Sequence, residues 1–167
     1  MSDKMSGRET SAGVVVIRHD PIKGACILML SVYGRFDLPK GHTEPDNPSL
    51  LATAARELFE EASFELMPVG SDLMASIPVA SLISDENYKC SNVDSKTGKV
   101  KKDVYLYAAE TLYAGPIEIR PNKDGIKEHD AAIWVPFDSV EKSRLHAYMK
   151  PGALWAMDLY SSRVLRR

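Results

Sequence analysis

The residues best suited to chemistry are three glutamates in the segment Arg56-Glu57-Leu58-Phe59-Glu60-Glu61. On a helix that turns about 100° per residue, Glu57, Glu60 and Glu61 fall within an arc of roughly 100°. Like charges at these spacings destabilise a helix by about 0.2–0.5 kcal/mol per pair, and Arg56 neutralises only part of the charge. A hard divalent cation removes the conflict, because Mg²⁺ prefers carboxylate oxygen. The spacing indicates either a metal site or an acidic helix face exposed to water.

The residues around these glutamates predict the helix that must position them. Asn47 favours a helix N-cap and Pro48 suits the first helical position. The following apolar residues recur at helical spacing and predict one buried face: Leu51, Ala55, Leu58, Phe59 and Ala62. The acidic arc lies beside this face, so we expect the carboxylates at the edge of the buried surface, where a cleft can form.

Short apolar and β-branched runs predict a sheet around this helix. The expected strands are 14–17, 25–30, 76–83, 104–110 and 131–135, the first two forming a hairpin or lying as neighbouring strands. Segment 33–42 is predicted to be a loop, and 85–102 is a polar, lysine-rich stretch. The tail 137–165 has helical spacing in two pieces, broken at Pro151-Gly152. This order predicts an α/β (α+β) fold in which helices pack on a mixed sheet.

Length and composition limit the possible classes of protein. The chain has 167 residues, which predicts a loose N-terminal segment 1–10 and a single domain over 11–167. The formal net charge of −2 argues against generic nucleic-acid binding, because no overall positive field attracts phosphates. No apolar run is long enough to span a membrane, and no signal segment is recognisable at the start. With only two cysteines, a cytoplasmic location is expected.

The loop and helix together resemble the Nudix box, the signature of the Nudix hydrolase family. The family pattern is a glycine, five residues, a glutamate, seven residues, and then Arg-Glu-apolar-any-Glu-Glu-any-Gly-apolar. Here Gly41 opens the motif and residues 56–64 close it, with one residue more than the pattern between Gly41 and Arg56. The first glutamate of the pattern falls on Asp46 or Asn47, and Ser63 replaces the last glycine. The resemblance implies a Nudix-type α/β/α sandwich.

The resemblance also implies a reaction and its cofactor. Nudix enzymes use magnesium or manganese to hydrolyse a nucleoside diphosphate linked to another group. By this resemblance Glu57, Glu60 and Glu61 are catalytic residues that bind the metal, and the carbonyl of Lys40 is a further ligand. Which glutamate acts as general base varies within the family and stays open. Arg56 is expected to orient the glutamates.

Residues that flank the box are similar to the diadenosine tetraphosphate hydrolase branch of the family. The turn at 39–45 reads Pro-Lys-Gly-His-Thr-Glu-Pro, and Glu128-His129 opens a stretch that ends in Trp134. This similarity implies a small-molecule nucleotide substrate, diadenosine tetraphosphate, cleaved asymmetrically to ATP and AMP. It also implies phosphate contacts from His42 and Lys102, stacking of Tyr88 on adenine, and Glu128 as a further metal ligand or base. His129 and His146 are interpreted as surface or structural histidines.

Other functions remain open from the sequence. Lysines gather between residues 89 and 102, which suits a highly charged substrate such as a diphosphoinositol polyphosphate. Removal of pyrophosphate from RNA 5′ ends is a further enzymatic alternative. The longer spacing and Ser63 also leave open a Nudix-fold module that binds nucleotide or RNA without hydrolysis. The intact glutamates favour the enzyme, and the sequence does not specify an oligomeric state.

Overall fold

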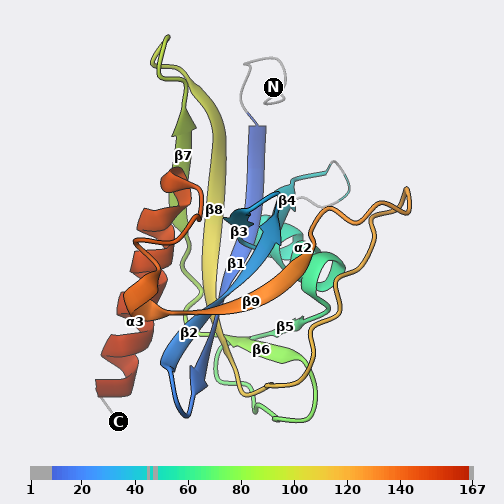
Figure 1. The fold of residues 1–167 in the computed structure, drawn as a ribbon, viewed down its shortest axis with the longest axis vertical. Helices are drawn as coiled ribbons and strands as arrows, with labels where there is room; N and C mark the ends of the chain where they lie inside the picture. The colour runs from blue at the N-terminus through green and yellow to red at the C-terminus, as the bar shows by residue number, and fades with distance from the viewer. Residues whose placement is uncertain (1–8, 45, 47–48, 166–167) are drawn as a thin grey trace.

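A computed structural model describes residues 9–44, 46 and 49–165 of the chain. Its centre is a mixed sheet of nine strands in the order β3-β2-β1-β8-β6-β5, with β4 paired to β1, β7 to β8 and β9 to β2 (Figure 1). The strands are β1 (Glu9–Asp20), β2 (Gly24–Val32), β3 (Arg35–Asp37), β4 (Lys40–His42), β5 (Glu65–Met67), β6 (Val79–Leu82), β7 (Tyr88–Val93), β8 (Val100–Thr111) and β9 (Ala131–Pro136). The helices are α2 (Leu50–Ala62) and α3 (Lys150–Leu165), with short 3₁₀ turns η1 (Phe137–Ser139) and η2 (Ala147–Met149).

Strand β1 organises the sheet. It runs parallel to β8 from Glu9, opposite Lys102, to Arg18, opposite Thr111. On its other side it forms an antiparallel hairpin with β2, as the sequence predicted. Gly24 supplies the positive φ of 79° that this turn requires.

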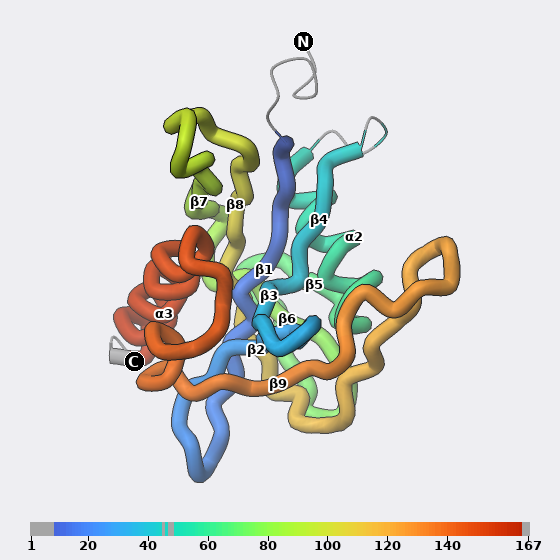
Figure 2. Tube along the Cα trace, turned by 45° about the horizontal axis from the view of Figure 1, so that its top comes forward, coloured from blue at the N-terminus to red at the C-terminus, as the bar shows by residue number. Residues whose placement is uncertain are grey.

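Alternation along β1 divides the core into two layers. Val14 and Val16 belong to a buried cluster with Leu58 of α2, whereas Val15 and Ile17 belong to a second cluster with residues of α3. Because successive strand residues face opposite sides, the two helices cover opposite faces of the sheet. Figure 2 shows α3 on one side of the strands and α2 on the other. The predicted α/β/α sandwich with a mixed sheet is confirmed.

Helix α2 carries the predicted glutamates but turns its apolar residues differently from the prediction. Its described part begins at Leu50, and the Ser49 hydroxyl caps it by accepting the N–H of Ala52 at 2.9 Å. Asn47 and Pro48, the predicted cap and first helical residue, lie outside the described residues. Thr53, Ala54, Leu58, Glu61 and Ala62 are buried. Of the predicted buried face, Leu51 and Phe59 are instead exposed, and the Arg120 guanidinium covers the Phe59 ring at 4.5 Å.

The prediction of a loop over 33–42 was wrong. This segment contains β3, which pairs with β2, and β4, which pairs with β1. Both strands have three residues, so their own apolar pattern is too short to indicate a strand, and pairing with longer strands creates them. Strand β1 likewise begins at Glu9, inside the range 1–10 for which no regular structure was expected.

The predicted break at Pro151-Gly152 was also wrong. Helix α3 starts at Lys150 and continues through both residues, because proline in a first turn has no N–H to lose from helical pairing. Gly152 allows the helix to approach the sheet closely, since a β-carbon there would lie 2.6 Å from Leu106 Cδ1 and 2.8 Å from Cys90 Sγ.

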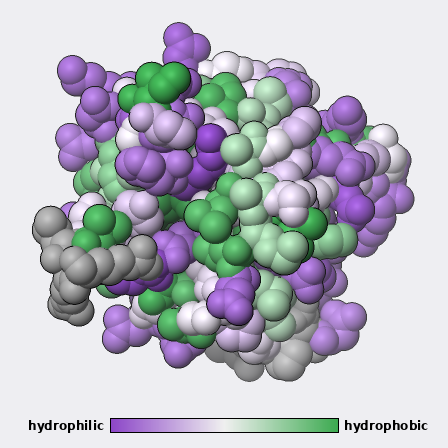
Figure 3. Space-filling model, turned by 90° about the horizontal axis from the view of Figure 1, so that it is seen from below, coloured by the Kyte–Doolittle hydropathy of each residue, from purple (hydrophilic) through white to green (hydrophobic). Residues whose placement is uncertain are grey.

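The surface is mixed in character. Seen from below, hydrophobic side chains gather near the middle of the face, with hydrophilic groups around them (Figure 3). Among the described helices, none combines the length and the apolar character needed to cross a bilayer.

Candidate active site

Arg56 joins helix α2 to strand β4. Its Nη1 donates hydrogen bonds to Glu57 Oε1 at 3.0 Å and to Glu60 Oε2 at 3.2 Å, and its Nη2 donates to the carbonyl of His42 at 3.1 Å. These charge-assisted hydrogen bonds connect the planar guanidinium to both carboxylates and to the strand. The structure thus brings Arg56 into contact with Glu57 and Glu60, and its orienting role stays a prediction.

Glu57 occupies the narrow space between α2 and β4. Its side chain is 14 % exposed, and a β-carbon built on Gly41 would lie 2.1 Å from Glu57 Cδ. Only glycine at this position leaves room for the carboxylate. Burial, with added repulsion from Glu60 and Glu128, raises the pKa of Glu57 to about 7, although Arg56 opposes the shift.

Glu61 is fixed by the backbone of the same short strand. The N–H of Lys40 donates to Glu61 Oε1 at 2.8 Å, and the carboxyl is 10 % exposed. Burial raises the pKa of Glu61 to about 9, and the nearby charges of Glu57 and Asp37 add to the effect. The Lys40 N–H and the Lys40 ammonium only partly offset it.

The segment before β9 adds two further groups to this acidic cluster. One ligand atom each from Glu61, Glu128 and His129 lie within 4.8 Å of one another. Glu128 is exposed and accepts a hydrogen bond from Asn122 Nδ2 at 3.2 Å. The structure thus brings Glu128 close to Glu61 of the helix, and its role as metal ligand or base stays a prediction.

His129 and Asp37 are the residues of this cluster that sequence reasoning did not assign to it. His129 is buried, with Nδ1 3.4 Å from Glu61 Oε2 and Nε2 3.7 Å from Asp37 Oδ2. Lys40 Nζ donates to the same Asp37 oxygen at 3.2 Å. Contacts with His129 and Lys40 overcome burial and lower the pKa of Asp37 to about 2. The one signal in the sequence was the adjacency of His129 to Glu128.

The donor set fits a divalent metal. Glu57, Glu60, Glu61 and Glu128 supply hard carboxylate oxygens, the ligands that Mg²⁺ and Mn²⁺ prefer. Burial, with the neighbouring carboxylates, raises the pKa of both Glu57 and Glu61, so their ionised forms are costly without a further positive charge. A bound dication would supply that charge. The structure places the Lys40 backbone beside Glu61, and the ligand role of its carbonyl stays a prediction.

Cationic side chains lie on the other face of β4. Gly41 faces Glu57, so the alternating side chains of Lys40 and His42 point to the opposite side of the strand. His42 Nε2 lies 3.3 Å from Glu9 Oε2, and Glu9 is paired with Lys102 across β1 and β8. Burial and the nearby Lys40 ammonium lower the pKa of Lys102. His42 and Lys102 therefore both lie beside Glu9. The ammonium group of Lys40 lies near Lys102 and donates to Asp37.

Tyr88 lies apart from the glutamates. Its ring is 5.8 Å from the ring of Trp155 in α3, and it packs against the second core cluster together with Gly152. The structure thus gives Tyr88 partners within the protein, and the predicted stacking on adenine stays a prediction.

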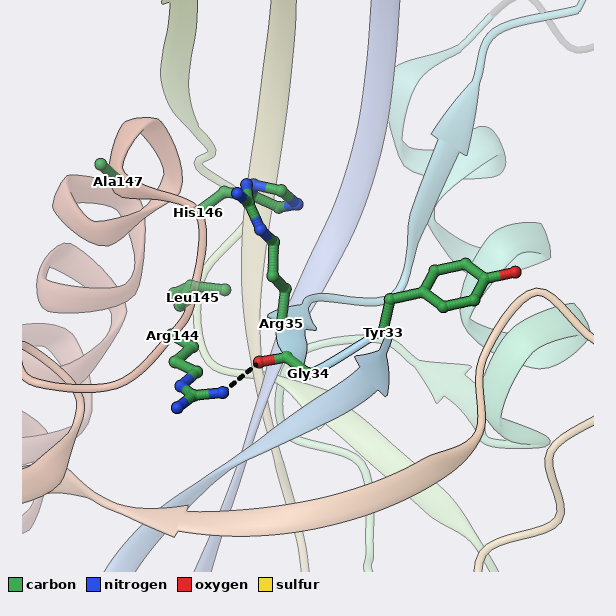
Figure 4. A pocket seen from close by; sticks show the side chains of 7 residues that line it. All are labelled: Tyr33, Gly34, Arg35, Arg144, Leu145, His146 and Ala147. Atoms are coloured by element: carbon green, nitrogen blue, oxygen red, sulfur yellow. Dashed lines mark hydrogen bonds between the residues drawn. The ribbon is translucent and has the colours of Figure 1, made fainter.

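A shallow basic cavity of about 440 Å³ lies beyond Lys40, between the β2–β3 turn and the segment before η2. It is lined by Tyr33, Gly34, Arg35, Arg144, Leu145, His146 and Ala147. Figure 4 shows Arg35 and His146 near each other and Arg144 hydrogen-bonded to the Gly34 carbonyl, at 3.2 Å, while the Tyr33 ring points away from them. Burial lowers the pKa of His146, and the charges of Lys40, Arg35 and Lys102 contribute to the shift. The positively charged lining of the cavity therefore lies close to Lys40 and Lys102.

Solved structures with this fold come from several organisms. An Ap4A hydrolase of C. elegans in a binary complex is 20 % identical, with a TM-score of 0.65, covering 95 % of this chain and 99 % of that one. The NUDIX domain of Shewanella oneidensis NrtR, complexed with ADP ribose, is 16 % identical, with a TM-score of 0.59 and coverage of 94 % and 88 %. The Nudix hydrolase RenU of M. smegmatis is 15 % identical, with a TM-score of 0.61 and coverage of 93 % and 87 %. These similarities show a shared fold.

Sequence comparison decides the family. No curated protein sequence matches the chain. A sequence model of the NUDIX domain matches residues 7–155, which include every strand and α2 with its glutamates. The Nudix enzymes it describes act on pyrophosphate bonds with a divalent metal, and the acidic cluster around α2 suits that chemistry. The chain therefore belongs to the Nudix hydrolase family and is a pyrophosphohydrolase.

Proposed function

We propose that this enzyme hydrolyses diadenosine tetraphosphate asymmetrically, with Mg²⁺, to ATP and AMP. One observation carries the proposal: a single strand, β4, has the partly buried carboxylate of Glu57 on one face and the cationic side chains of Lys40 and His42 on the other. We infer that an extended polyphosphate bound at the carboxylate face passes β4, so that its further phosphates contact these cations. A shorter diphosphate engages fewer of the cations.

The acidic face of β4 performs the chemistry. A bound divalent ion offsets charge on the phosphoryl oxygens and lowers the pKa of water. Glu57, Glu60 and Glu61 hold this ion, and one of them also accepts the proton from the attacking water. Arg56 keeps Glu57 and Glu60 in place through its contacts at 3.0 and 3.2 Å.

The cationic face of β4 binds the phosphates that the metal does not hold. Lys102 is half-buried beside Lys40 and Glu9, so its side chain has few alternative positions. A charge held in this way loses little entropy on contact with phosphate. His42 is exposed beside Glu9, at a position that the substrate can reach. Together these residues favour a substrate with more than two phosphates.

A substrate panel tests the proposal. The purified enzyme is incubated with Mg²⁺ and diadenosine tetra-, penta- and hexaphosphate, diphosphoinositol phosphates, triphosphorylated RNA and nucleotide sugars, and the products are separated by chromatography. We expect the highest kcat/KM for diadenosine tetraphosphate, with ATP and AMP as products. Two molecules of ADP, or faster turnover of another class, would overturn the proposal.

A matched pair of lysine variants tests the cationic face. Lys102 is half-buried beside Lys40, whereas its neighbour Lys101 is exposed. Lys102→Ala is expected to raise KM for diadenosine tetraphosphate by about tenfold, the loss of one charged hydrogen bond of about 1.5 kcal/mol. Lys101→Ala is expected to leave KM within about twofold, because exposed charges are screened by salt. Equal effects of the two changes would mean that Lys102 does not contact the substrate.

The basic cavity favours a second candidate, a diphosphoinositol polyphosphate. Arg35, Arg144 and His146 line it, and a ligand with phosphates on several ring positions would use these cations together with Lys40 and Lys102. The same panel decides between the two candidates. Faster cleavage of the inositol compounds than of every dinucleotide would establish this second function.

A further inference from the structure

Four contacts form a closed ring around Glu61. The Lys40 N–H binds Glu61 Oε1 at 2.8 Å, and Lys40 Nζ binds Asp37 Oδ2 at 3.2 Å. His129 completes the ring, with Nε2 3.7 Å from Asp37 Oδ2 and Nδ1 3.4 Å from Glu61 Oε2. Each Glu61 oxygen thus has one partner, and the two partners are both anchored on Asp37.

The polar side chains of this ring are largely buried, which is costly and indicates that their contacts serve a function. The side chains of His129, Glu61 and Asp37 are 7 %, 10 % and 15 % exposed. Polar groups removed from water are costly unless they are paired, and removing one partner leaves the other uncompensated. Among the described residues, the ion-pair partners of the His129 ring are these two carboxylates, and one of them is a proposed metal ligand.

We propose that His129, oriented by Asp37, is a positioning residue that fixes the Glu61 carboxylate for metal binding. This inference rests on the metal site of the proposed function. His129 contacts Oε2 while the Lys40 N–H donates to Oε1, and contacts to both oxygens restrict rotation of the carboxylate. In metal sites generally, groups that contact a ligand side chain orient it and strengthen metal binding.

Through its position next to Glu128, His129 also helps to place the Glu128 carboxylate. Glu128 precedes it directly, and the N–H of Asp130 donates to the Ser31 carbonyl of β2 at 2.7 Å. His129 is therefore fixed on the sheet side by Asp130 and on the helix side by Glu61. This anchoring holds Glu128 near Glu61, within the 4.8 Å that joins their ligand atoms.

A double-mutant cycle on metal affinity tests the proposal without substrate. Mn²⁺ alone is titrated into wild-type enzyme, His129→Leu, Glu61→Gln and the double variant, and free Mn²⁺ is measured by electron paramagnetic resonance. His129→Leu is expected to weaken Mn²⁺ binding about 10- to 100-fold, as loss of groups that orient metal ligands does. In the Glu61→Gln background the same change is expected to have no more than about a twofold effect, because His129 acts through Glu61. Effects that multiply would overturn the proposal.

Controls separate positioning from folding. His19→Leu changes an exposed histidine on β1 and is expected to leave Mn²⁺ affinity unchanged. Circular dichroism establishes that each variant is folded. If His129→Leu does not fold, His129→Gln and Asp37→Asn take its place in the cycle. Each is expected to weaken Mn²⁺ binding in the wild-type background and to have little further effect with Glu61→Gln; wild-type affinity in both would overturn the proposal.

A spectroscopic measurement separates positioning from direct ligation. Electron spin echo modulation of bound Mn²⁺ is expected to show no directly bonded imidazole nitrogen. A nitrogen signal that disappears in His129→Leu would make His129 a ligand and overturn the positioning role. Because no nucleotide is present, an enzyme that binds Mn²⁺ but does not cleave diadenosine tetraphosphate would reject the proposed substrate and leave this test valid.

Discussion

The carboxylate of Glu57 lies directly against the α-carbon of Gly41. A β-carbon on Gly41 would lie 2.1 Å from Glu57 Cδ and 2.2 Å from Glu57 Oε1, far inside van der Waals contact. The backbone of Gly41 has no positive φ, so conformational freedom is not the reason for glycine here. The reason is space: the strand and the carboxylate can approach each other only when no side chain separates them.

Gly41→Ala is therefore expected to inactivate the enzyme without unfolding it. The new methyl group displaces Glu57 from the metal site, and we expect kcat to fall about 100-fold or more, as when a group that stabilises the transition state is removed. Gly70→Ala is the matched control. Gly70 has a φ of 82° and open space around it, so alanine there should lower the free energy of unfolding by about 1 kcal/mol and leave kcat unchanged. Activity in Gly41→Ala near that of the wild type would contradict the role of Glu57.

Glu60→Gln tests the metal-ligand role of the most exposed of the three α2 glutamates. Glu60 is 53 % exposed and is held by Arg56, so the amide variant should keep the fold. Loss of one carboxylate charge from the site is expected to lower kcat about 100-fold or more at saturating Mg²⁺. The exposed Glu65 of β5 provides the control, and Glu65→Gln should retain full activity. Turnover by Glu60→Gln at the wild-type rate would refute the assignment.

The raised pKa values predict how the stability of the metal-free protein depends on pH. The carboxyls of Glu57 and Glu61 ionise near pH 4.5 in the unfolded chain and near pH 7 and 9 in the folded protein. Between these values the folded protein keeps protons that the unfolded chain has released, so stability falls as pH rises. The decrease due to Glu57 ends near pH 7, and that due to Glu61 continues toward pH 9.

Thermal melts in EDTA from pH 5 to 9 measure this dependence. We expect Tm to fall over that range, and Glu61→Gln to flatten the decrease, because the amide does not ionise. The pKa of Asp37 is lowered to about 2, so Asp37 stabilises the fold above pH 3.8 and adds no slope in this range. Mg²⁺ should raise Tm more at pH 8 than at pH 5, since it binds the ionised carboxylates. A Tm that rises from pH 5 to 8 in EDTA would contradict the prediction.

Ser63 predicts a stability difference between two substitutions. It ends α2 in the left-handed conformation, with φ of 62°, where its N–H donates to the Phe59 carbonyl at 3.0 Å. This conformation costs a residue with a side chain about 1–2 kcal/mol relative to glycine. The Ser63 hydroxyl recovers part of that by donating to the Glu118 carbonyl at 3.1 Å. Ser63→Gly should thus be more stable than Ser63→Ala by about 1 kcal/mol or more in urea unfolding, and equal stability of the two variants would refute the strain.

The sequence identified the helix and its acidic arc because both depend on local spacing. Glu57, Glu60 and Glu61 lie on α2, and the structure adds that Glu57 packs against Gly41 of β4 and that Glu61 accepts the N–H of Lys40. That strand was missed, since three residues carry no usable period and β4 exists through its pairing with β1. At Ser63, which replaces the last glycine of the family pattern, the structure shows a left-handed end of the helix.

The role of His129 shows what local patterns do not contain. Its two partners, Asp37 on β3 and Glu61 on α2, are distant in the chain and are brought together only by the packed sheet and helix. The sequence could indicate Glu128 through the family resemblance, yet it gave no sign that the next residue faces two carboxylates. Phe59 illustrates the same limit: its helical spacing suited the core, but the rotation of α2 exposes it to Arg120.

Strand β4 is short enough to open locally, and its opening would affect how a metal ion is held and released. Three residues fasten this strand to β1, and two of them also set Glu57 and Glu61. Transient opening of so short an edge strand costs far less free energy than global unfolding. Such opening would be enough to displace Glu57 and Glu61 from the proposed metal site. Amide hydrogens of Lys40 and Gly41 should accordingly exchange with deuterium faster in EDTA than in Mg²⁺, while those at the middle of β1 stay protected in both.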